Sequence, residues 1–341
     1  MQHDIARARW WLAYPVALLL LAILDAFLGA WHPLPERLPD QFSPAYLHLV
    51  LRDAAKTPPA TLVLGDSVLW GYKIAPQQTA VAALQQELPD AHLINLAYEG
   101  GSTPNSSVLL DEALASGIRV RGVVVNLNVK EFNANDSAYR TLHPSLERAA
   151  LPLLGARDRT LLVMHEPNDL NARLNGIAER VWRLYRLRID LRERLFGTDD
   201  LTSAVGAFFK RLTGAAATEA AMHVPTPDKF LGTYDLSPID PSNVGMIYYR
   251  KMLATLCAKK IPTLVFLTPT NHTLLHDYID TPDYDANLHL LMRVPHCSSV
   301  RIVNLDRAIP GDEFIDNDHL TPAGNQRLAA LLKPYVEDLR P

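Results

Sequence analysis

A series of short apolar segments, each ending in polar or turn-forming residues, is the feature of this sequence that most limits its fold. Their continuous Val, Ile and Leu content, without strict alternation, is typical of strands that are buried on both faces. Segments with helical periodicity lie between them. The predicted strands are residues 61–64, 92–96, 122–127, 262–267 and 301–305, and the predicted helices include residues 79–87, 106–116 and 247–259.

The alternation of strands and helices predicts an α/β fold, in which helices cover both faces of a parallel sheet. A flavodoxin-like three-layer sandwich of about five strands fits this pattern, with the functional site at the carboxyl ends of the strands. The composition is that of an ordinary globular protein, with 48% hydrophobic residues. The formal net charge of −4 lacks the basic excess of nucleic-acid-binding proteins, so no nucleic-acid partner is expected.

The chain has only two cysteines, Cys257 and Cys297. They are too few for a tetrahedral metal site, and we expect neither a metal nor another cofactor. They precede the fourth and fifth predicted strands, so both should lie near the same edge of the sheet. An oxidising compartment would favour a disulfide between them, while two buried free thiols would be equally ordinary.

A long segment interrupts the regular alternation between the third and fourth strands. Residues 134–245 are far more than a simple crossover needs, and they predict a helical insertion. Within it, residues 170–195 are basic and amphipathic. This stretch is interpreted either as a helix packed on the core or as an element that covers the site or faces a membrane.

The N-terminal segment, residues 1–31, differs in composition from the rest of the chain. Residues 10–31 read WWLAYPVALLLLAILDAFLGAW, long enough to cross a bilayer, with aromatic residues at both ends. Asp25 is a charge within this span, near its outer end. The segment predicts an N-terminal transmembrane helix. Two alternatives are a cleaved signal peptide, for which the small-residue cleavage site is poor, and a buried core helix.

The charges around this span predict its orientation. Arg7 and Arg9 precede the apolar stretch, and short basic flanks stay in the cytoplasm. The sequence therefore predicts a single-pass protein of the inner (cytoplasmic) membrane whose main domain, residues 59–341, is periplasmic or otherwise extracytoplasmic. Residues 32–58 are rich in proline and charge and are interpreted as a linker.

The first candidate catalytic motif follows the first predicted strand. Residues 61–71 read TLVLGDSVLWG, so an apolar strand leads directly into Gly65, Asp66 and Ser67. A serine at a strand-to-helix turn exposes its hydroxyl at the top of the sheet, where it can act as a nucleophile. Alternatively, Ser67 serves only as a helix N-cap.

The second motif lies near the C-terminus. Residues 313–332 read EFIDNDHLTPAGNQRLAALL, with Asp316 three residues before His319. A serine hydroxyl needs a base within hydrogen-bond reach, and the base needs a carboxylate that fixes its tautomer. We therefore expect Ser67 as nucleophile, His319 as base and Asp316 as the orienting carboxylate. Asp318 is an alternative carboxylate, although adjacent residues usually point apart.

These motifs resemble the SGNH/GDSL hydrolase superfamily, whose four sequence blocks occur in a fixed order. Ser67 with its two preceding residues matches the first block, and Asp316 with His319 matches the fourth. In residues 95–105, NLAYEGGSTPN, Gly100 takes the place of the glycine of the second block. The resemblance implies an SGNH fold and a serine esterase or acyltransferase in which the backbone amides of Ser67 and Gly100 stabilise the oxyanion.

The third block departs from the family pattern. Residues 122–133 read GVVVNLNVKEFN, and Lys130 falls where the family has an asparagine. Asn128 lies two positions earlier and can reach the site from the end of the strand. We expect Asn128 as the third oxyanion donor, with Lys130 as the alternative. Because losing one such donor costs roughly 10²–10³ in rate, a non-catalytic scaffold that binds glycan or a membrane acyltransferase is the alternative function.

Membrane-anchored relatives without a standard third block include the D-alanyl transfer protein and the alginate O-acetylation proteins, and this chain is similar to them in layout. The similarity implies action on acyl, in particular acetyl, esters of an envelope or secreted polysaccharide. It also implies a multispanning partner of the membrane-bound O-acyltransferase (MBOAT) class. In residues 266–278, Asn271 and His272 would line the acceptor site, or they lie in a solvated loop.

Overall fold

The computed structural model describes residues 2–28, 34–164, 170–196 and 226–339. Its centre is a five-stranded parallel sheet with the strand order β2-β1-β3-β4-β5. This confirms the predicted α/β fold, and each strand lies within two residues of its predicted bounds. The strands are β1 (Ala60–Leu64), β2 (Leu93–Asn95), β3 (Val120–Leu127), β4 (Thr263–Leu267) and β5 (Val300–Asn304).

The interior strands are more buried than the edge strand β5, as their apolar sequences indicate. Every residue of β1 and of β4 is buried, because helices cover both faces of these interior strands. The register aligns Leu64 with Val125 on β3 and Val125 with Val265 on β4, so branched apolar side chains pack side by side. β5 lies at one edge and is partly exposed.

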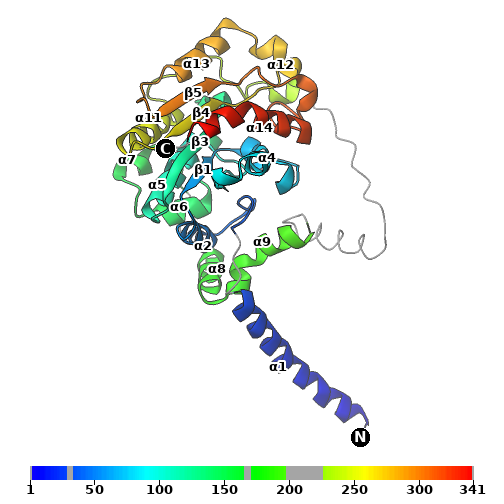
Figure 1. The fold of residues 1–341 in the computed structure, drawn as a ribbon. Coiled ribbons are helices and arrows are strands. Elements are labelled where there is room, and N and C mark those ends of the chain that lie inside the picture. The colour runs from blue at the N-terminus through cyan, green and yellow to red at the C-terminus, as the bar shows by residue number, and fades with distance from the viewer. Residues whose placement is uncertain (1, 29–33, 165–169, 197–225, 340–341) are drawn as a thin grey trace.

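Two pairs of helices form the outer layers (Figure 1). Helices α4 (Ala80–Glu87) and α14 (Pro322–Glu337) pack together on one face of the sheet, and α5 (Thr103–Ala115) and α11 (Val244–Ala258) pack together on the other. The remaining helices are α1 (Gln2–Leu28), α2 (Pro44–Ala54), α3 (Ser67–Trp70), α6 (Pro144–Ala150), α7 (Ala156–Leu161), α8 (Leu170–Val181), α9 (Arg183–Phe196), α12 (His272–Ile279) and α13 (Pro282–Met292). Short 3₁₀ turns are η1 (Pro76–Gln78), η2 (Pro89–Ala91), η3 (Val129–Phe132), η4 (Ser137–Arg140), η5 (Pro227–Phe230) and η6 (Gly311–Glu313).

The strand order also fixes where a site can form. The chain leaves β1 for β2 on one side and later reaches β3 on the other, so the connections diverge at the carboxyl ends of β1 and β3. In open α/β sheets this divergence opens a crevice that commonly holds the ligand. Ser67 follows β1, and Asn128 and Lys130 follow β3, so the candidate residues of the first and third family blocks lie at this crevice.

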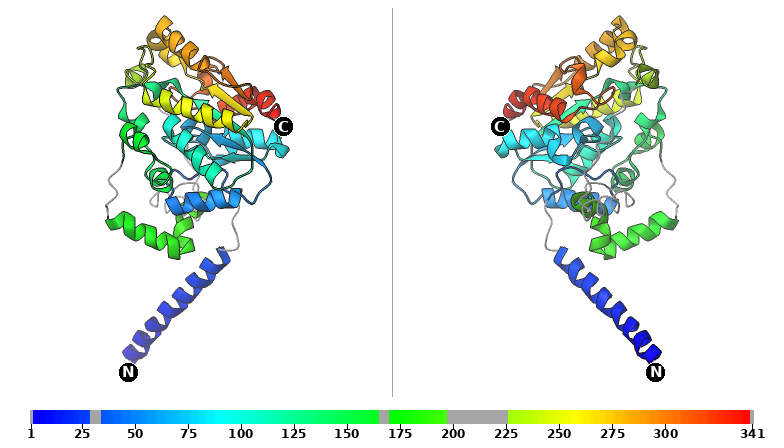
Figure 2. Two further views of the ribbon diagram at one scale, coloured as in Figure 1. Left: turned by 90° about the vertical axis from the view of Figure 1, so that its left-hand side faces the viewer. Right: turned by 90° about the vertical axis from the view of Figure 1, so that its right-hand side faces the viewer.

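The N-terminal region differs in part from its prediction. α1 is one continuous helix that extends away from the domain (Figure 2), and residues 29–31 of the expected anchor lie outside the described residues. Over the part of the chain that the structure describes, no helix combines the length and apolar character needed to cross a membrane. The expected linker contains α2, in which Tyr46, Leu47 and Val50 are buried in the core. The prolines and charges of this region led us to expect a linker. A helix forms nevertheless, because Pro44 occupies its first turn, where proline is well tolerated.

The described part of the insertion between β3 and β4 contains several helices, as predicted. The stretch expected as one amphipathic helix is two helices, α8 and α9, with a break at Trp182. Residues 165–169 and 197–225 of the insertion lie outside the described residues. The two cysteines form a disulfide, with 5.7 Å between the Cα atoms of Cys257 and Cys297, which confirms that they lie together.

Candidate active site

The nucleophile candidate sits at the sharp exit from β1. Gly65 adopts φ +152°, and a Cβ there would lie 1.6 Å from Oδ1 of Asn126, so only glycine fits without displacing that side chain. Asp66, rather than Ser67, caps the short helix α3, because its carboxylate accepts from the N–H of Val68 at 2.9 Å. The capping role proposed as the alternative for Ser67 is therefore filled by its neighbour. Ser67 is the first residue of α3.

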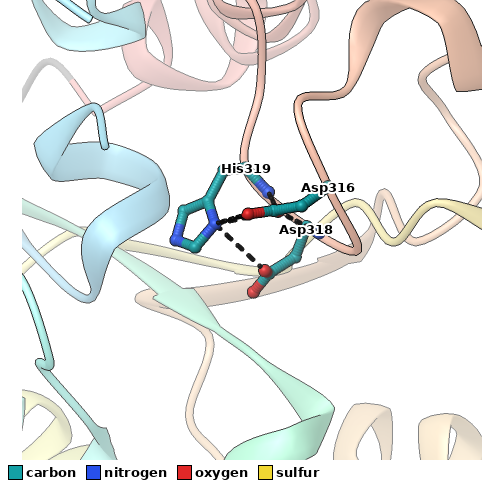
Figure 3. Close-up of side chains that lie close together, drawn as sticks. All are labelled: Asp316, Asp318 and His319. Carbon is teal, nitrogen blue, oxygen red and sulfur yellow. Dashed lines mark hydrogen bonds and ion pairs between the residues drawn. The ribbon is translucent and has the colours of Figure 1, made fainter. Parts of the chain in front are cut away.

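The three residues expected to form a triad meet at this point. Ser67 Oγ lies 2.8 Å from His319 Nε2. His319 Nδ1 lies 2.8 and 2.9 Å from the two carboxylate oxygens of Asp316 (Figure 3). A proton on Nδ1 that is donated to Asp316 leaves Nε2 free to accept the serine proton, which is the tautomer a general base requires. The chain from hydroxyl to imidazole to carboxylate is thus complete.

Hydrogen bonds fix the loop that carries Asp316 and His319, both within the loop and from Asn271. The N–H of Ile315 donates to the carbonyl of His319 at 2.7 Å, which closes a tight turn around the motif. Asn271, at the carboxyl end of β4, donates from its side chain to the carbonyl of Asp316 at 2.9 Å, and its N–H donates to the carbonyl of Asn317 at 2.8 Å. Asn271 therefore positions the loop that carries Asp316 and His319, a role that its sequence position alone did not reveal.

The surroundings shift the pKa of His319 and that of its partner carboxylate in opposite directions. Burial works to lower the pKa of His319, but Asp318 and the hydrogen-bonded Asp316 outweigh it and raise the pKa above its ordinary value. Burial works to raise the pKa of Asp316, but the hydrogen bonds from His319 prevail and lower it to about 2. The ring of Tyr72 lies 4.4 Å from the imidazole ring, centroid to centroid, and covers it.

A second carboxylate, Asp318, lies beneath the imidazole. It is fully buried, and its Oδ1 lies 3.5 Å from His319 Nδ1 (Figure 3). Its Oδ2 accepts from the side chain of Asn128 at 2.7 Å and forms an ion pair with Lys130. The two aspartates do not point apart, because the tight turn brings both to one ring nitrogen. Asp316, the closer and bidentate partner, is the orienting carboxylate.

The contacts of Asn128 and Lys130 do not fit the oxyanion roles expected for them. The side-chain amide of Asn128 donates to Asp318 and, at 3.3 Å, to Oδ2 of Asp66, so both of its hydrogens are directed at carboxylates. The ammonium of Lys130 is ion-paired with Asp318. We therefore correct the expected donor set: these two residues hold buried acids in place beneath the triad. Counting along the strand could not reveal this, because it does not show where a side chain points.

Two backbone amides remain as candidate oxyanion donors, those of Ser67 and Gly100. Within the described chain, neither the N–H of Ser67 nor that of Gly100 donates a hydrogen bond to the protein. Gly100 is exposed and adopts φ +73° in the turn after β2. The neighbouring Gly101 is buried, and a Cβ there would lie 2.4 Å from the carbonyl oxygen of Gly65, so this turn packs directly against the nucleophile turn. The donors expected from Ser67 and Gly100 remain a prediction.

The sequence reasoning missed one residue that organises the site from β3. The side chain of Asn126 donates to Oδ1 of Asp66 at 2.6 Å and to Oγ1 of Thr268 at 3.0 Å, and its Oδ1 accepts from the N–H of Asp66 at 3.1 Å. It thereby joins the ends of three strands. An asparagine inside a run of valines is a signal that could have identified it, because a buried amide requires partners.

A second missed residue is Glu131, which is buried behind the site. Its carboxylate accepts from the N–H and the hydroxyl of Thr103, at 2.5 and 2.7 Å, at the start of α5. Burial and the nearby Asp66 raise its pKa well above the ordinary value.

His272 is not in a solvated loop. Its Nε2 lies 2.6 Å from Asp306 and its Nδ1 lies 2.5 Å from Asp280, which also pairs with Arg307. Burial works to lower the pKa of His272, but the hydrogen bond to Asp306 prevails and raises it. Both ring nitrogens are therefore occupied within the fold, and these bonds join the ends of β4 and β5 to α12. The acceptor-site role expected for His272 stays a prediction.

The same residues also carry atoms of the kinds that bind metal ions. Among the described residues, Asp316, Asp318 and His319 form a group whose ligand atoms lie within 4.8 Å of one another. The carboxylate of Asp316, both ring nitrogens of His319 and Oδ2 of Asp318 already make the hydrogen bonds of the triad and the ion pair with Lys130. The arrangement suits proton transfer between a hydroxyl and an imidazole.

Comparison of the chain with models of known protein families gives no match, and a search of curated proteins gives no significant match. The geometry of the site is therefore the basis for the functional proposal that follows.

Proposed function

We propose that this protein is a serine esterase or O-acyltransferase of the SGNH/GDSL type that acts on acyl esters, in particular acetyl esters, of an envelope or secreted polysaccharide. The observation that carries the proposal is the hydrogen-bonded chain Ser67–His319–Asp316 at the carboxyl end of β1, with 2.8 Å between Ser67 Oγ and His319 Nε2. This position is the one where an open α/β sheet binds its ligand. The polysaccharide part of the proposal rests on the sequence resemblance.

The proposed reaction has two half-reactions with balanced proton transfers. His319 Nε2 takes the proton of Ser67 as Oγ attacks the acyl carbonyl carbon, and the N–H groups of Ser67 and Gly100 donate to the oxyanion. The ester C–O bond then breaks, and His319 returns the proton to the departing alcohol. Water or a sugar hydroxyl, deprotonated by His319, next attacks the acyl-serine. The first acceptor gives hydrolysis and the second gives transfer.

The proposed location is the outer side of the cytoplasmic membrane, with α1 as a single-pass anchor. Apolar side chains of α1 such as Leu18 and Phe27 are highly exposed, and the basic residues that precede them favour a cytoplasmic N-terminus. The Cys257–Cys297 disulfide fits an oxidising compartment. A multispanning acyltransferase of the MBOAT class is the proposed partner that would supply or receive the acyl group.

One observation favours a second candidate, a non-catalytic SGNH-like scaffold that binds glycan or the membrane partner. Asn128 and Lys130, the residues nearest to the third family block, are both engaged with buried carboxylates. The site then lacks a side-chain oxyanion donor.

Hydrolysis of p-nitrophenyl acetate by the full chain separates these candidates. We expect the wild type to hydrolyse the ester and Ser67→Ala to lose about 10⁴–10⁶ of the rate. Ser116→Ala, a change at the C-cap of α5, is the matched control and should retain activity. An acetylated oligosaccharide with a second glycan as acceptor then distinguishes transfer from hydrolysis. A folded wild type that hydrolyses no ester would support the scaffold, and an active Ser67→Ala would exclude the triad.

A further inference from the structure

Helices α8 and α9 meet at Trp182 and lie crosswise (Figure 1), and this helix pair, called the hairpin below, is on the side of the domain from which α1 extends (Figure 2). The hairpin contacts α1 directly. Oδ1 of Asp25, near the end of α1, accepts from the N–H of Leu184 in the first turn of α9 at 2.5 Å. An acceptor at that position satisfies an orphan donor of the helix N-terminus and complements its dipole. Asp25, the one carboxylate within the apolar span, therefore joins α1 to the hairpin.

The face of α8 that points away from the protein is apolar. Leu174, Ile177 and Val181 lie at helical spacing on this face and are 55%, 57% and 76% exposed. Glu179, on the opposite face, is 3% exposed. A helix of a soluble protein normally shows the reverse arrangement, with its apolar stripe on the core. An exposed stripe of this kind marks a binding surface, and Trp182, 40% exposed, extends it.

The apolar stripe borders a strongly basic region, and its Ile177 lines the cavity there. A cavity of about 900 Å³ lies between the hairpin and helices α2 and α6. Among its lining residues, Glu179 is the acid, and it pairs with Arg188 at 3.0 Å. The basic lining residues are His48, Arg52, Arg148, Arg180, Arg186 and Arg188. The cavity therefore carries a clear excess of positive charge beside the apolar stripe.

We propose that the α8–α9 hairpin docks on the surface of an anionic phospholipid bilayer. The apolar stripe of α8 enters the boundary between headgroups and acyl chains, and the arginines beside it contact lipid phosphates, as in interfacial amphipathic helices. The proposal deepens the membrane location proposed above and rests on it. The contact between Asp25 and Leu184 supports this occupant, because a bilayer that holds α1 would meet the hairpin at the outer end of α1. A soluble partner would not explain the excess of arginines beside an apolar stripe next to α1.

A fluorescent label at the apolar stripe tests this proposal in the full chain. Both native cysteines are paired, so Ile177→Cys provides the thiol for an environment-sensitive NBD label. Leu290→Cys is the matched control, since Leu290 is a 37% exposed leucine on α13, outside the hairpin. The labelled proteins are reconstituted into vesicles of phosphatidylcholine, with or without phosphatidylglycerol, that contain brominated lipid as quencher.

We expect brominated lipid to remove about half of the emission at position 177 and to leave position 290 unchanged. Phosphatidylglycerol should increase the quenching, and the double variant Arg52→Gln, Arg180→Gln should abolish that increase. Flotation of the vesicles and hydrolysis of p-nitrophenyl acetate are measured on the same samples.

Each failure has a distinct result. An unquenched label at position 177 on protein that floats with the vesicles would overturn the hairpin proposal and leave the anchor and the esterase intact. A blue-shifted but unquenched label would also overturn it, because protein rather than lipid would cover α8. Absence of flotation would overturn both the hairpin and the anchor. Quenching at position 177 without ester hydrolysis would support the hairpin and contradict the proposed activity.

Discussion

The buried pair beneath the triad gives a prediction whose sign follows from charge alone. Asp318 lies 3.5 Å from His319 Nδ1 and raises the pKa of the imidazole, while Lys130 opposes it. Asp318→Asn should therefore lower the pKa of His319, and Lys130→Met should raise it. Since His319 acts as a base only when neutral, the acidic limb of kcat/KM should move to lower pH in the first variant and to higher pH in the second.

The magnitude can be bounded from the distance. A unit charge at this separation interacts with the imidazolium by about 1 kcal/mol in bulk water and about 5 kcal/mol at an effective dielectric constant of 20. Lys130 stays in place in Asp318→Asn, so that variant reports the interaction with Asp318 by itself, and the lower bound corresponds to about one pH unit. We therefore expect opposite shifts of about one pH unit, which is about 1.4 kcal/mol. Lys130→Met should also lower stability by about 3–5 kcal/mol, because it leaves a buried carboxylate without its cation.

The assay is the pH dependence of p-nitrophenyl acetate hydrolysis by the wild type, both single variants and the double variant Lys130→Met, Asp318→Asn. The double variant removes both charges, so its profile should lie between those of the single variants and its stability should recover part of the loss. Shifts of the same sign in both single variants, or no shift in Asp318→Asn, would refute the electrostatic reasoning.

Three further predictions concern stability. Gly65→Ala should lower the melting temperature and abolish ester hydrolysis, because the new Cβ would overlap a buried asparagine side chain, whereas Gly176→Ala in α8, which meets no atom within 4 Å, should not. Reduction of the disulfide, which spans 40 residues, should lower the free energy of unfolding by about 4 kcal/mol in denaturant titrations. His272→Gln should destabilise the fold most below about pH 6.5 and progressively less as the pH rises through the raised pKa of His272, because the charged form makes the favourable bonds. A constant difference across that range would contradict the histidine assignment.

The sheet could be predicted from sequence because buried parallel strands leave a strong local signal. Continuous apolar runs such as residues 122–127 mark strands covered on both faces, whichever helices cover them. Helix α2 was missed because its sequence carries prolines and charges nearby, and its burial depends on contacts with distant helices. The expected helix over residues 170–195 divides into two, and Trp182 at the break carries no glycine or proline signal.

The triad could be predicted because its members carry specific chemistry at recognisable spacings, and the structure brings all three within hydrogen-bond distance. The contacts of the residues that support the triad could not be predicted in the same way. Whether Asn128 faces the substrate or Asp318 depends on the twist of a strand end and the path of a loop 190 residues away. Asn271 positions the loop of Asp316 and His319 by donating to its backbone carbonyls, and such contacts cannot be predicted from residue types.

The most direct test of the central claim is the reaction of the full chain with a fluorophosphonate, read out by intact mass and peptide mapping. A serine activated by a neutral histidine attacks the phosphorus and forms a stable covalent adduct. We expect one adduct per chain, on Ser67, that disappears in Ser67→Ala and in His319→Gln and forms more slowly as the pH falls below the raised pKa of His319. A folded wild type that forms no adduct, or an adduct that maps to another residue, would contradict it.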